Sequence, residues 1–122
     1  MAAVELTKED FEEVVSRNDM VIVDFWAPWC APCRAFAPTF EEASENHADV
    51  VFAKVNTEDE QELAGAFNIR SIPTLMVFRE KVILYAEAGS LPASALEQVI
   101  AQAKNVDMAA VHSEIAERGA ES

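Results

Sequence analysis

The sequence has little cysteine, glycine and positive charge, and it has no long apolar run. It holds two cysteines and three glycines in 122 residues, so a disulfide-stapled framework is excluded. No apolar run approaches the roughly 20 residues of a membrane-spanning helix. The start, "MAAVELTKED", lacks the basic and then apolar pattern of a signal peptide. We therefore expect a cytoplasmic protein, and in that compartment a close cysteine pair indicates redox or metal chemistry.

Basic residues are outnumbered more than two to one. Nine Lys and Arg stand against 22 Asp and Glu, which gives a formal net charge of -13. Such a surface repels nucleic-acid phosphates and anionic membranes, so we expect neither as a partner. The charge also keeps the chain soluble, and it favours encounter with partners that carry basic rims.

Apolar runs and helical periodicities alternate along the chain. The expected strands are residues 20–26, 49–56, 74–79 and 82–88. The expected helices begin after Thr7, at about Ala31, at about Glu58 and after Ser90. The last two strands are joined by a connection so short that they must pair antiparallel. The pattern predicts one α/β domain with a central mixed sheet flanked by helices on both faces.

The two cysteines, Cys30 and Cys33, follow a buried strand and open a helix. Free amides and the helix dipole at that position stabilise a thiolate, so Cys30 is the expected nucleophile and Cys33, further into the helix, the resolving thiol. Pro32 suits the first helical turn. The spacing alone fits redox chemistry and metal ligation equally well, but zinc needs further ligands, and His47 and His112 have no ligand spacing. A metal cluster shared between two chains stays open.

Asp24 lies in the middle of the apolar run "VIVDFW". Burial should raise the pKa of this carboxyl and make it a proton donor or acceptor near neutral pH, where it could exchange a proton with Cys33. The alternative is a structural aspartate paired with a backbone amide or a lysine. Lys54, at the same level of the neighbouring expected strand, is a candidate counter-charge or an ordinary solvated lysine.

Several motifs together resemble the bacterial thioredoxins. These are "VDFWAPWCAPC", Pro38, "AKVN", "IRSIPT" and Gly89, which occur in that order within residues 4–103. The resemblance implies the thioredoxin fold, catalytic roles for Cys30 and Cys33, Asp24 as a buried proton carrier with Lys54 beside it, and a cis peptide between Ile72 and Pro73. It also implies an apolar surface that binds protein substrates, made of Trp29, Ala31, Pro32, Ile72, Pro73, Ala88 and Gly89.

The implied activity is reduction of protein disulfides, an oxidoreductase role in electron transport and cell redox homeostasis. The redox group is the Cys30–Cys33 disulfide itself, with no bound cofactor and no metal. The implied partners are disulfide-containing proteins and an NADPH-dependent flavin reductase, and we expect a monomer. Two alternatives remain open: a disulfide oxidant, and a thioredoxin-fold binding or scaffold subunit without turnover.

Three features depart from the family pattern. Ala31 and Lys81 stand where the family usually has glycine, so we expect the turn at Lys81 to be strained or reshaped. Residues 1–104 are the expected thioredoxin domain, and residues 105–122 extend past it. The extension predicts a short helix, because apolar residues recur at helical spacing: Met108, Val111 and Ile115. Asp107 is the candidate N-cap of this helix, and Gly119 is the candidate residue at which it ends. So short a helix either packs on something or frays.

Overall fold

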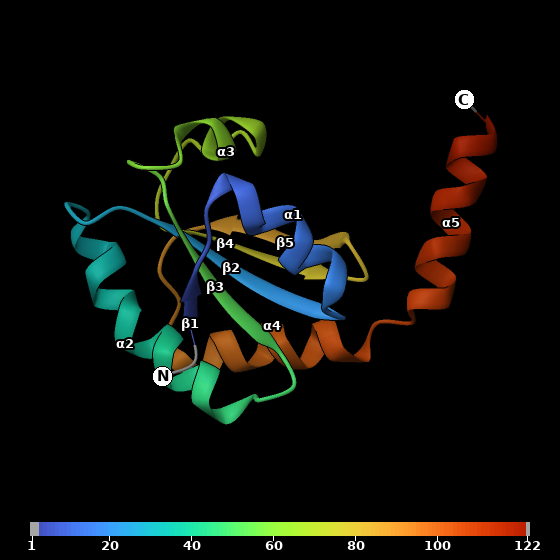
Figure 1. Ribbon diagram of the computed structural model, residues 1–122. Coiled ribbons are helices and arrows are strands. Elements are labelled where there is room, and N and C mark those ends of the chain that lie inside the picture. The colour runs from blue at the N-terminus through green and yellow to red at the C-terminus, as the bar shows by residue number, and fades with distance from the viewer. Residues whose placement is uncertain (1–2, 122) are drawn as a thin grey trace.

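The apolar run Met20–Trp26 forms β2, the middle strand of a five-stranded sheet. A computed structural model describes residues 3–121 of the chain and shows helices against both faces of this sheet (Figure 1). The side chains of Val21, Ile22, Val23 and Phe25 have no exposed surface. Burial on both faces is the reason that this strand is continuously apolar instead of alternating.

The sheet has the order β1-β3-β2-β4-β5. β1 and β2 run parallel to β3, whereas β4 is antiparallel to both β2 and β5. The strands are β1 (Ala3–Glu5), β2 (Met20–Trp26), β3 (Val51–Asn56), β4 (Thr74–Arg79) and β5 (Val82–Ala88). The expected mixed sheet is confirmed. The edge strand β1 was not expected, because three residues are too few to show a period.

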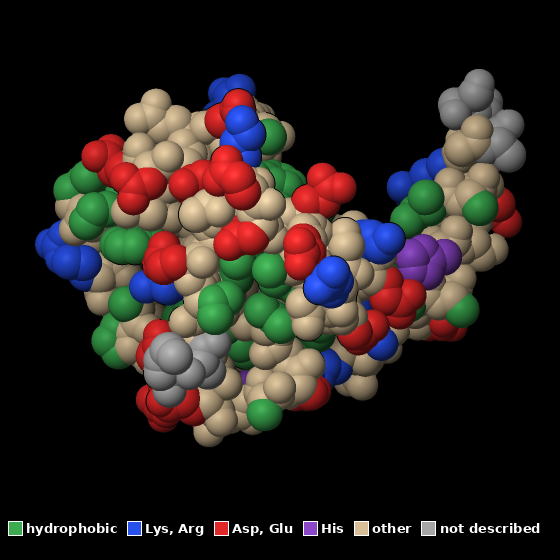
Figure 2. All heavy atoms as spheres, in the orientation of Figure 1, with side chains coloured by type: hydrophobic (Ala, Val, Ile, Leu, Met, Phe, Trp, Pro, Cys, Tyr) green, Lys and Arg blue, Asp and Glu red, His purple; other side chains and the backbone are tan. Residues whose placement is uncertain are grey.

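The helices form two layers, one on each side of the sheet (Figure 1). One core lies beneath α2 (Ala31–Asn46) and α4 (Ala93–Asn105) and contains Phe36, Phe40, Leu96 and Ile100. The other, which contains Phe11, Val15 and Leu63, lies beneath α1 (Lys8–Arg17) and α3 (Gln61–Ala66). Acidic side chains are spread over the face shown in Figure 2, as the net charge leads one to expect.

Local signals fixed some helix starts and missed others. Thr7 and Asp10 form the expected capping contact, since the Thr7 N–H donates to Asp10 Oδ1 at 2.7 Å. The prediction that Ser90 caps α4 is wrong, because Pro92 is the N-cap residue. The third helix begins later than the expected start at about Glu58, because a turn precedes Gln61.

The turn between β4 and β5 is strained. Glu80 and Lys81 both have positive φ, 50° and 70°, in the left-handed region that glycine or asparagine adopts at lower cost. Lys81, which stands where the family usually has glycine, and its neighbour Glu80 both adopt this unfavourable backbone, so the strained form of the expectation is confirmed.

The extension forms α5 (Met108–Glu121), which points away from the sheet at the end of the molecule opposite the start of α2 (Figure 1). Asp107 caps it as expected, accepting from the Ala110 N–H at 3.1 Å, but Gly119 does not end it. The first residue, Met108, is only 6% exposed, whereas Ile115 is 44% exposed. The extension is therefore packed at its base and exposed along its length.

Arg79 of β4 joins this base to the domain. Its Nη1 donates to the carbonyl oxygens of Ala103, Lys104 and Val106 at 2.9, 3.0 and 3.0 Å. These bonds satisfy carbonyl groups that the end of α4 leaves without partners inside the helix.

We expect the position of a truncation to decide its effect on stability. A chain that ends after Lys104 loses Met108 and one Arg79 acceptor, which should lower the free energy of unfolding by about 1–3 kcal/mol. A chain that ends after Ser113 keeps both and should stay within about 0.5 kcal/mol of the full chain. Urea unfolding measures the two values, and equal stability of the two truncated chains would contradict this placement.

Candidate active site

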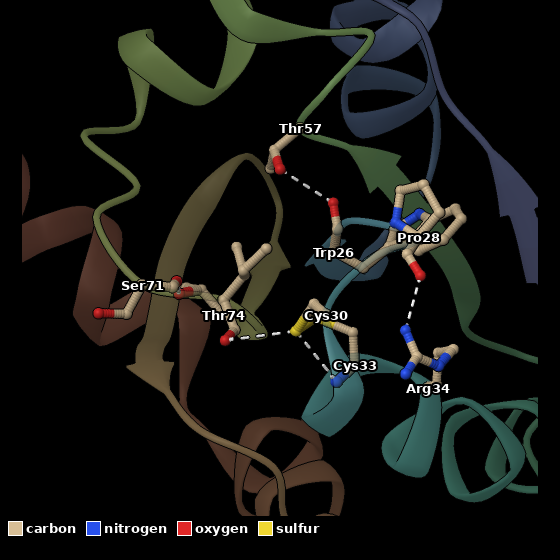
Figure 3. The surroundings of a disulfide bond; sticks show 9 residues. Trp26, Pro28, Cys30, Cys33, Arg34, Thr57, Ser71 and Thr74 are labelled. Atoms are coloured by element: carbon tan, nitrogen blue, oxygen red, sulfur yellow. Dashed lines mark hydrogen bonds between the residues drawn. A yellow bond between two sulfur atoms is a disulfide. The ribbon is translucent and has the colours of Figure 1, made fainter.

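Cys30 and Cys33 form a disulfide at the start of α2 (Figure 3). Cys30 is the N-cap residue, and its Sγ accepts a hydrogen bond from the Cys33 N–H at 3.2 Å. A free amide directed at this sulfur stabilises negative charge on it, as does the positive end of the helix dipole. Cys30 and Cys33 are 5% and 2% exposed, so both are buried in the disulfide form. What distinguishes them is position, because Cys30 is the N-cap residue and Cys33 lies inside the helix.

A loop from the far side of the sheet lies against Cys30. The Ile72–Pro73 peptide is cis, as expected, and the Ile72 carbonyl oxygen is 3.7 Å from Cys30 Sγ. The Gly89 N–H donates to the Pro73 carbonyl oxygen at 2.8 Å, and the Thr74 hydroxyl donates to the Ser71 carbonyl (Figure 3). Segments distant in sequence therefore meet at Cys30.

The residues expected to bind substrate differ in exposure. Trp29 is 65% exposed. Ala31, Pro32, Ala88 and Gly89 are also exposed, Ile72 is half-buried, and Pro73 is buried. The Cys30–Ile72 contact, the Gly89–Pro73 bond and the pairing of Thr74 with Ala88 hold this set together. Pro73 therefore lies beneath the surface that was expected to bind substrate, and the other residues of the set form its solvent-facing part.

Two further residues hold the loop before Cys30, and the sequence pattern had not singled them out. Arg34 Nη1 donates to the Pro28 carbonyl at 2.8 Å, and Thr57 donates to the Trp26 carbonyl through both its N–H and its hydroxyl (Figure 3). Arg34 follows the CxxC motif directly, but no spacing rule shows that it turns back to Pro28.

Asp24 lies in β2 beside Lys54 of β3, as the sequence predicts. The carboxyl is 1% exposed, and neither oxygen has a hydrogen-bond partner within residues 3–121. Burial raises the pKa of Asp24 from 3.8 to about 7, with Lys54 lowering it and Glu5 raising it further. The direction agrees with the expected raised pKa. The backbone-paired form of the structural alternative is wrong, because neither oxygen accepts a backbone amide within residues 3–121, and Lys54 stays the candidate counter-charge.

Lys54 is placed by Trp26 instead of by a close ion pair with Asp24. Its Nζ lies 4.7 Å from the centroid of the Trp26 ring, in cation–π geometry. The ammonium group thus stays near the carboxylate without donating a hydrogen bond to it.

Both histidines have structural partners. His47 Nε2 is 2.7 Å from Glu97 Oε1, and His47 Nδ1 is 3.1 Å from Lys104 Nζ. His112 Nε2 lies 2.8 Å from Glu80 Oε1. Across the part of the chain that the structure describes, no group of three or more His, Cys, Asp or Glu side chains is placed to hold a metal ion.

Comparison with known proteins agrees with this geometry. Residues 2–102 match the family model for thioredoxin. The chain belongs to the thioredoxin family. Putative thioredoxin 2 of Streptomyces coelicolor is 50% identical over 121 residues, which cover 99% of this chain and 90% of that protein. Thioredoxin 1 of a Nostoc species is 39% identical over 101 residues, 81% of this chain and 94% of that protein.

The solved structures agree as well. The structure of Plasmodium falciparum thioredoxin superimposes with a TM-score of 0.76 at 35% identity, over 83% of this chain and 98% of that one. Family membership and the cysteine pair together support protein-disulfide oxidoreductase activity for this thioredoxin, with the Cys30–Cys33 disulfide as its redox group. Within residues 3–121, none of the helices combines the length and apolar character needed to span a bilayer.

We expect Asp24→Asn to stabilise the protein increasingly as pH rises. The buried carboxyl holds its proton in the folded state up to about pH 7 but in the unfolded state only up to about pH 3.8, so folding stability falls as pH rises through that window. The asparagine variant escapes this loss. Its advantage should be absent near pH 3 and grow to at most roughly 4 kcal/mol above pH 7, at about 1.36 kcal/mol per pKa unit.

Urea unfolding of the oxidised protein across this pH range gives the measurement. Asp59→Asn removes an exposed carboxyl and is the matched control, which should show no comparable rise. An advantage for Asp24→Asn that is constant with pH would contradict the raised pKa.

Proposed function

We propose that this thioredoxin reduces disulfides in other proteins, with Cys30 as the attacking thiol and Cys33 as the resolving thiol. The observation that carries the proposal is the position of Cys30 as N-cap of α2, where its sulfur accepts the Cys33 N–H. In the dithiol form the same donor and the helix dipole favour the Cys30 thiolate, which is the species that attacks a disulfide.

The reaction transfers two electrons and two protons. The Cys30 thiolate attacks one sulfur of the substrate disulfide, which forms a mixed disulfide and releases the other substrate sulfur as a thiolate that takes a proton. Cys33 then loses its proton and attacks the Cys30 sulfur. The second substrate sulfur leaves as a thiolate and takes up the second proton, and the Cys30–Cys33 disulfide remains.

Asp24 is the proposed acceptor of the Cys33 proton, with Lys54 as the charge that stabilises the resulting carboxylate state. The support is the pKa of about 7, at which a carboxyl exchanges protons at neutral pH. Neither role requires contact with the substrate.

The proposed substrate surface surrounds Cys30 and consists of Trp29, Ala31, Pro32, Ile72, Pro73, Ala88 and Gly89. Its support is the exposure of Trp29 beside a loop that contacts the nucleophile. A contiguous apolar patch favours proteins over small polar molecules. The Ile72 backbone lies at this surface, where an extended substrate segment can pair with it.

The remaining parts of the proposal concern the cellular setting. We assign return of electrons to an NADPH-dependent flavin reductase, and we place the protein in the cytoplasm as a monomer. Residues 1–104 form the catalytic domain and residues 105–122 an appendage. The family match over residues 2–102 supports this division.

We expect Cys30→Ser to abolish the reduction of insulin disulfides, measured in an assay in which dithiothreitol returns the protein to its dithiol form. Cys33→Ser should still attack but then stop, because no thiol resolves the mixed disulfide. Mass spectrometry should find Cys33→Ser bound to substrate and Cys30→Ser free. The reverse pattern would exchange the two roles.

The same assay separates the alternative functions. A scaffold subunit would give no turnover with either the wild-type chain or the variants. A disulfide oxidant would oxidise a reduced protein faster than it reduces insulin.

We expect Trp29→Ala to weaken protein substrates selectively. Loss of one exposed aromatic contact should raise KM for insulin about fivefold, equivalent to roughly 1 kcal/mol. Reaction with a small disulfide that is too short to reach Trp29 should be unchanged. The control is Ile83→Ala, which removes another exposed apolar side chain, at the end of β5 that lies away from Ala88. It should leave the reaction with insulin and the reaction with the small disulfide unaltered. Equal losses on both substrates would place Trp29 in folding instead of binding.

A further inference from the structure

Glu5, Lys54 and Asp24 form one row across three neighbouring strands. Glu5 of β1 pairs with Lys54 of β3, and Lys54 pairs with Asp24 of β2. Paired residues of adjacent strands point to the same face of a sheet. The residues two positions earlier on the three strands confirm the face, since all pack in the core beneath α2 and α4: Ala3, Phe52 and Ile22.

The row places a single cation between two carboxylates of unequal burial. Asp24 is buried, whereas Glu5 lies on the edge strand and keeps part of its surface in solvent. Partial burial of the carboxyl raises the pKa of Glu5; Lys54 and Trp26 oppose this effect, and Asp59 adds to it. Glu5 in turn raises the pKa of Asp24. The Lys54 charge therefore lowers the pKa of both carboxyls, and Glu5 opposes this effect at Asp24.

The other elements around Asp24 contribute no charge. β4 places Leu75 opposite it, and α2 covers this face with Phe36 and Phe40. Within residues 3–121, Lys54 and Glu5 are the charged groups that act on the Asp24 carboxyl, while Cys30 and Cys33 add titratable thiols nearby only when they are reduced.

We propose that Glu5 is a positioning residue of the thiol–disulfide reaction: it stands across Lys54 from Asp24, so two carboxylates share one ammonium charge, and this sharing sets the pH at which the Asp24 carboxylate takes up a proton. The proposal rests on the proposed function of Asp24 as the proton acceptor for Cys33. Glu5 does not touch the substrate or the sulfurs. It acts through the charge that Asp24 experiences.

The test replaces Glu5 by glutamine in the full, oxidised chain and follows the Asp24 carboxyl carbon by NMR through a pH titration. Loss of one negative charge two strands away should lower the Asp24 midpoint by roughly half a unit. Glu5→Asp, which keeps the charge, should lie closer to wild type. Glu9→Gln removes an exposed carboxylate from α1 and is the matched control, with no shift expected.

The pH profile of insulin reduction tests the consequence for the reaction. In Glu5→Gln the ionisation assigned to Asp24 should move downward by the same amount as in the titration, and in Glu9→Gln it should stay. An Asp24 midpoint that is unchanged or raised in Glu5→Gln overturns the proposal. An equal shift in Glu9→Gln, or a pH profile that does not follow the titration, overturns it too.

Failure of this proposal and failure of the proposed function are distinguishable. The titration uses no substrate, so it reports on Glu5 whether or not the chain turns over. A wild-type chain that reduces no disulfide would refute the reductase function, whereas an unshifted titration in an active chain would refute the role of Glu5 alone.

Discussion

Burial of β2 from Met20 to Phe25 is the constraint from which the site follows. Because apolar side chains of this strand fill cores on both faces of the sheet, its position and direction are fixed. The chain leaves it at Trp26 and enters α2 at Ala31, so Cys30 must stand at a helix start above the carboxyl end of a central strand. The same burial encloses Asp24, and this enclosure raises its pKa.

Two kinds of electrostatic stabilisation meet at this place. Backbone amides and the helix dipole act on the sulfur of Cys30, where they favour negative charge. Side-chain charges act on Asp24, where burial disfavours negative charge and Lys54 offsets only part of the penalty. Negative charge is therefore favoured at the Cys30 sulfur and disfavoured at the nearby carboxyl. With a pKa of about 7, Asp24 is present near neutral pH in both its neutral and its carboxylate form, and the carboxylate form can accept a proton.

In the proposed mechanism, stability and proton transfer place opposite demands on position 24. A neutral side chain at position 24 would remove a penalty that grows above the unfolded-state pKa of the aspartate, yet it would also remove the group that titrates near neutral pH. By contrast, the extension beyond Lys104 joins the domain through Arg79 and Met108, far from the sulfurs. These contacts lie at the end of the molecule opposite the start of α2 (Figure 1).

The sequence by itself determined the elements whose signals are local. Continuous apolar runs predicted β2, β3 and the hairpin of β4 and β5; cap residues predicted α1 and the base of α5; and the place of Cys30 between a strand and a helix predicted a stabilised thiolate. Asp24 and Lys54 were predicted as neighbours because equal positions on adjacent parallel strands fall in register.

The sequence missed β1, and therefore Glu5, because a three-residue edge strand becomes ordered only through its pairing with β3. It also missed the N-cap at Pro92 and the contacts that Arg79 and Arg34 make. Long side chains select their partners after the elements have packed, so only the tertiary structure decided which charges act on Asp24 and how the extension is held.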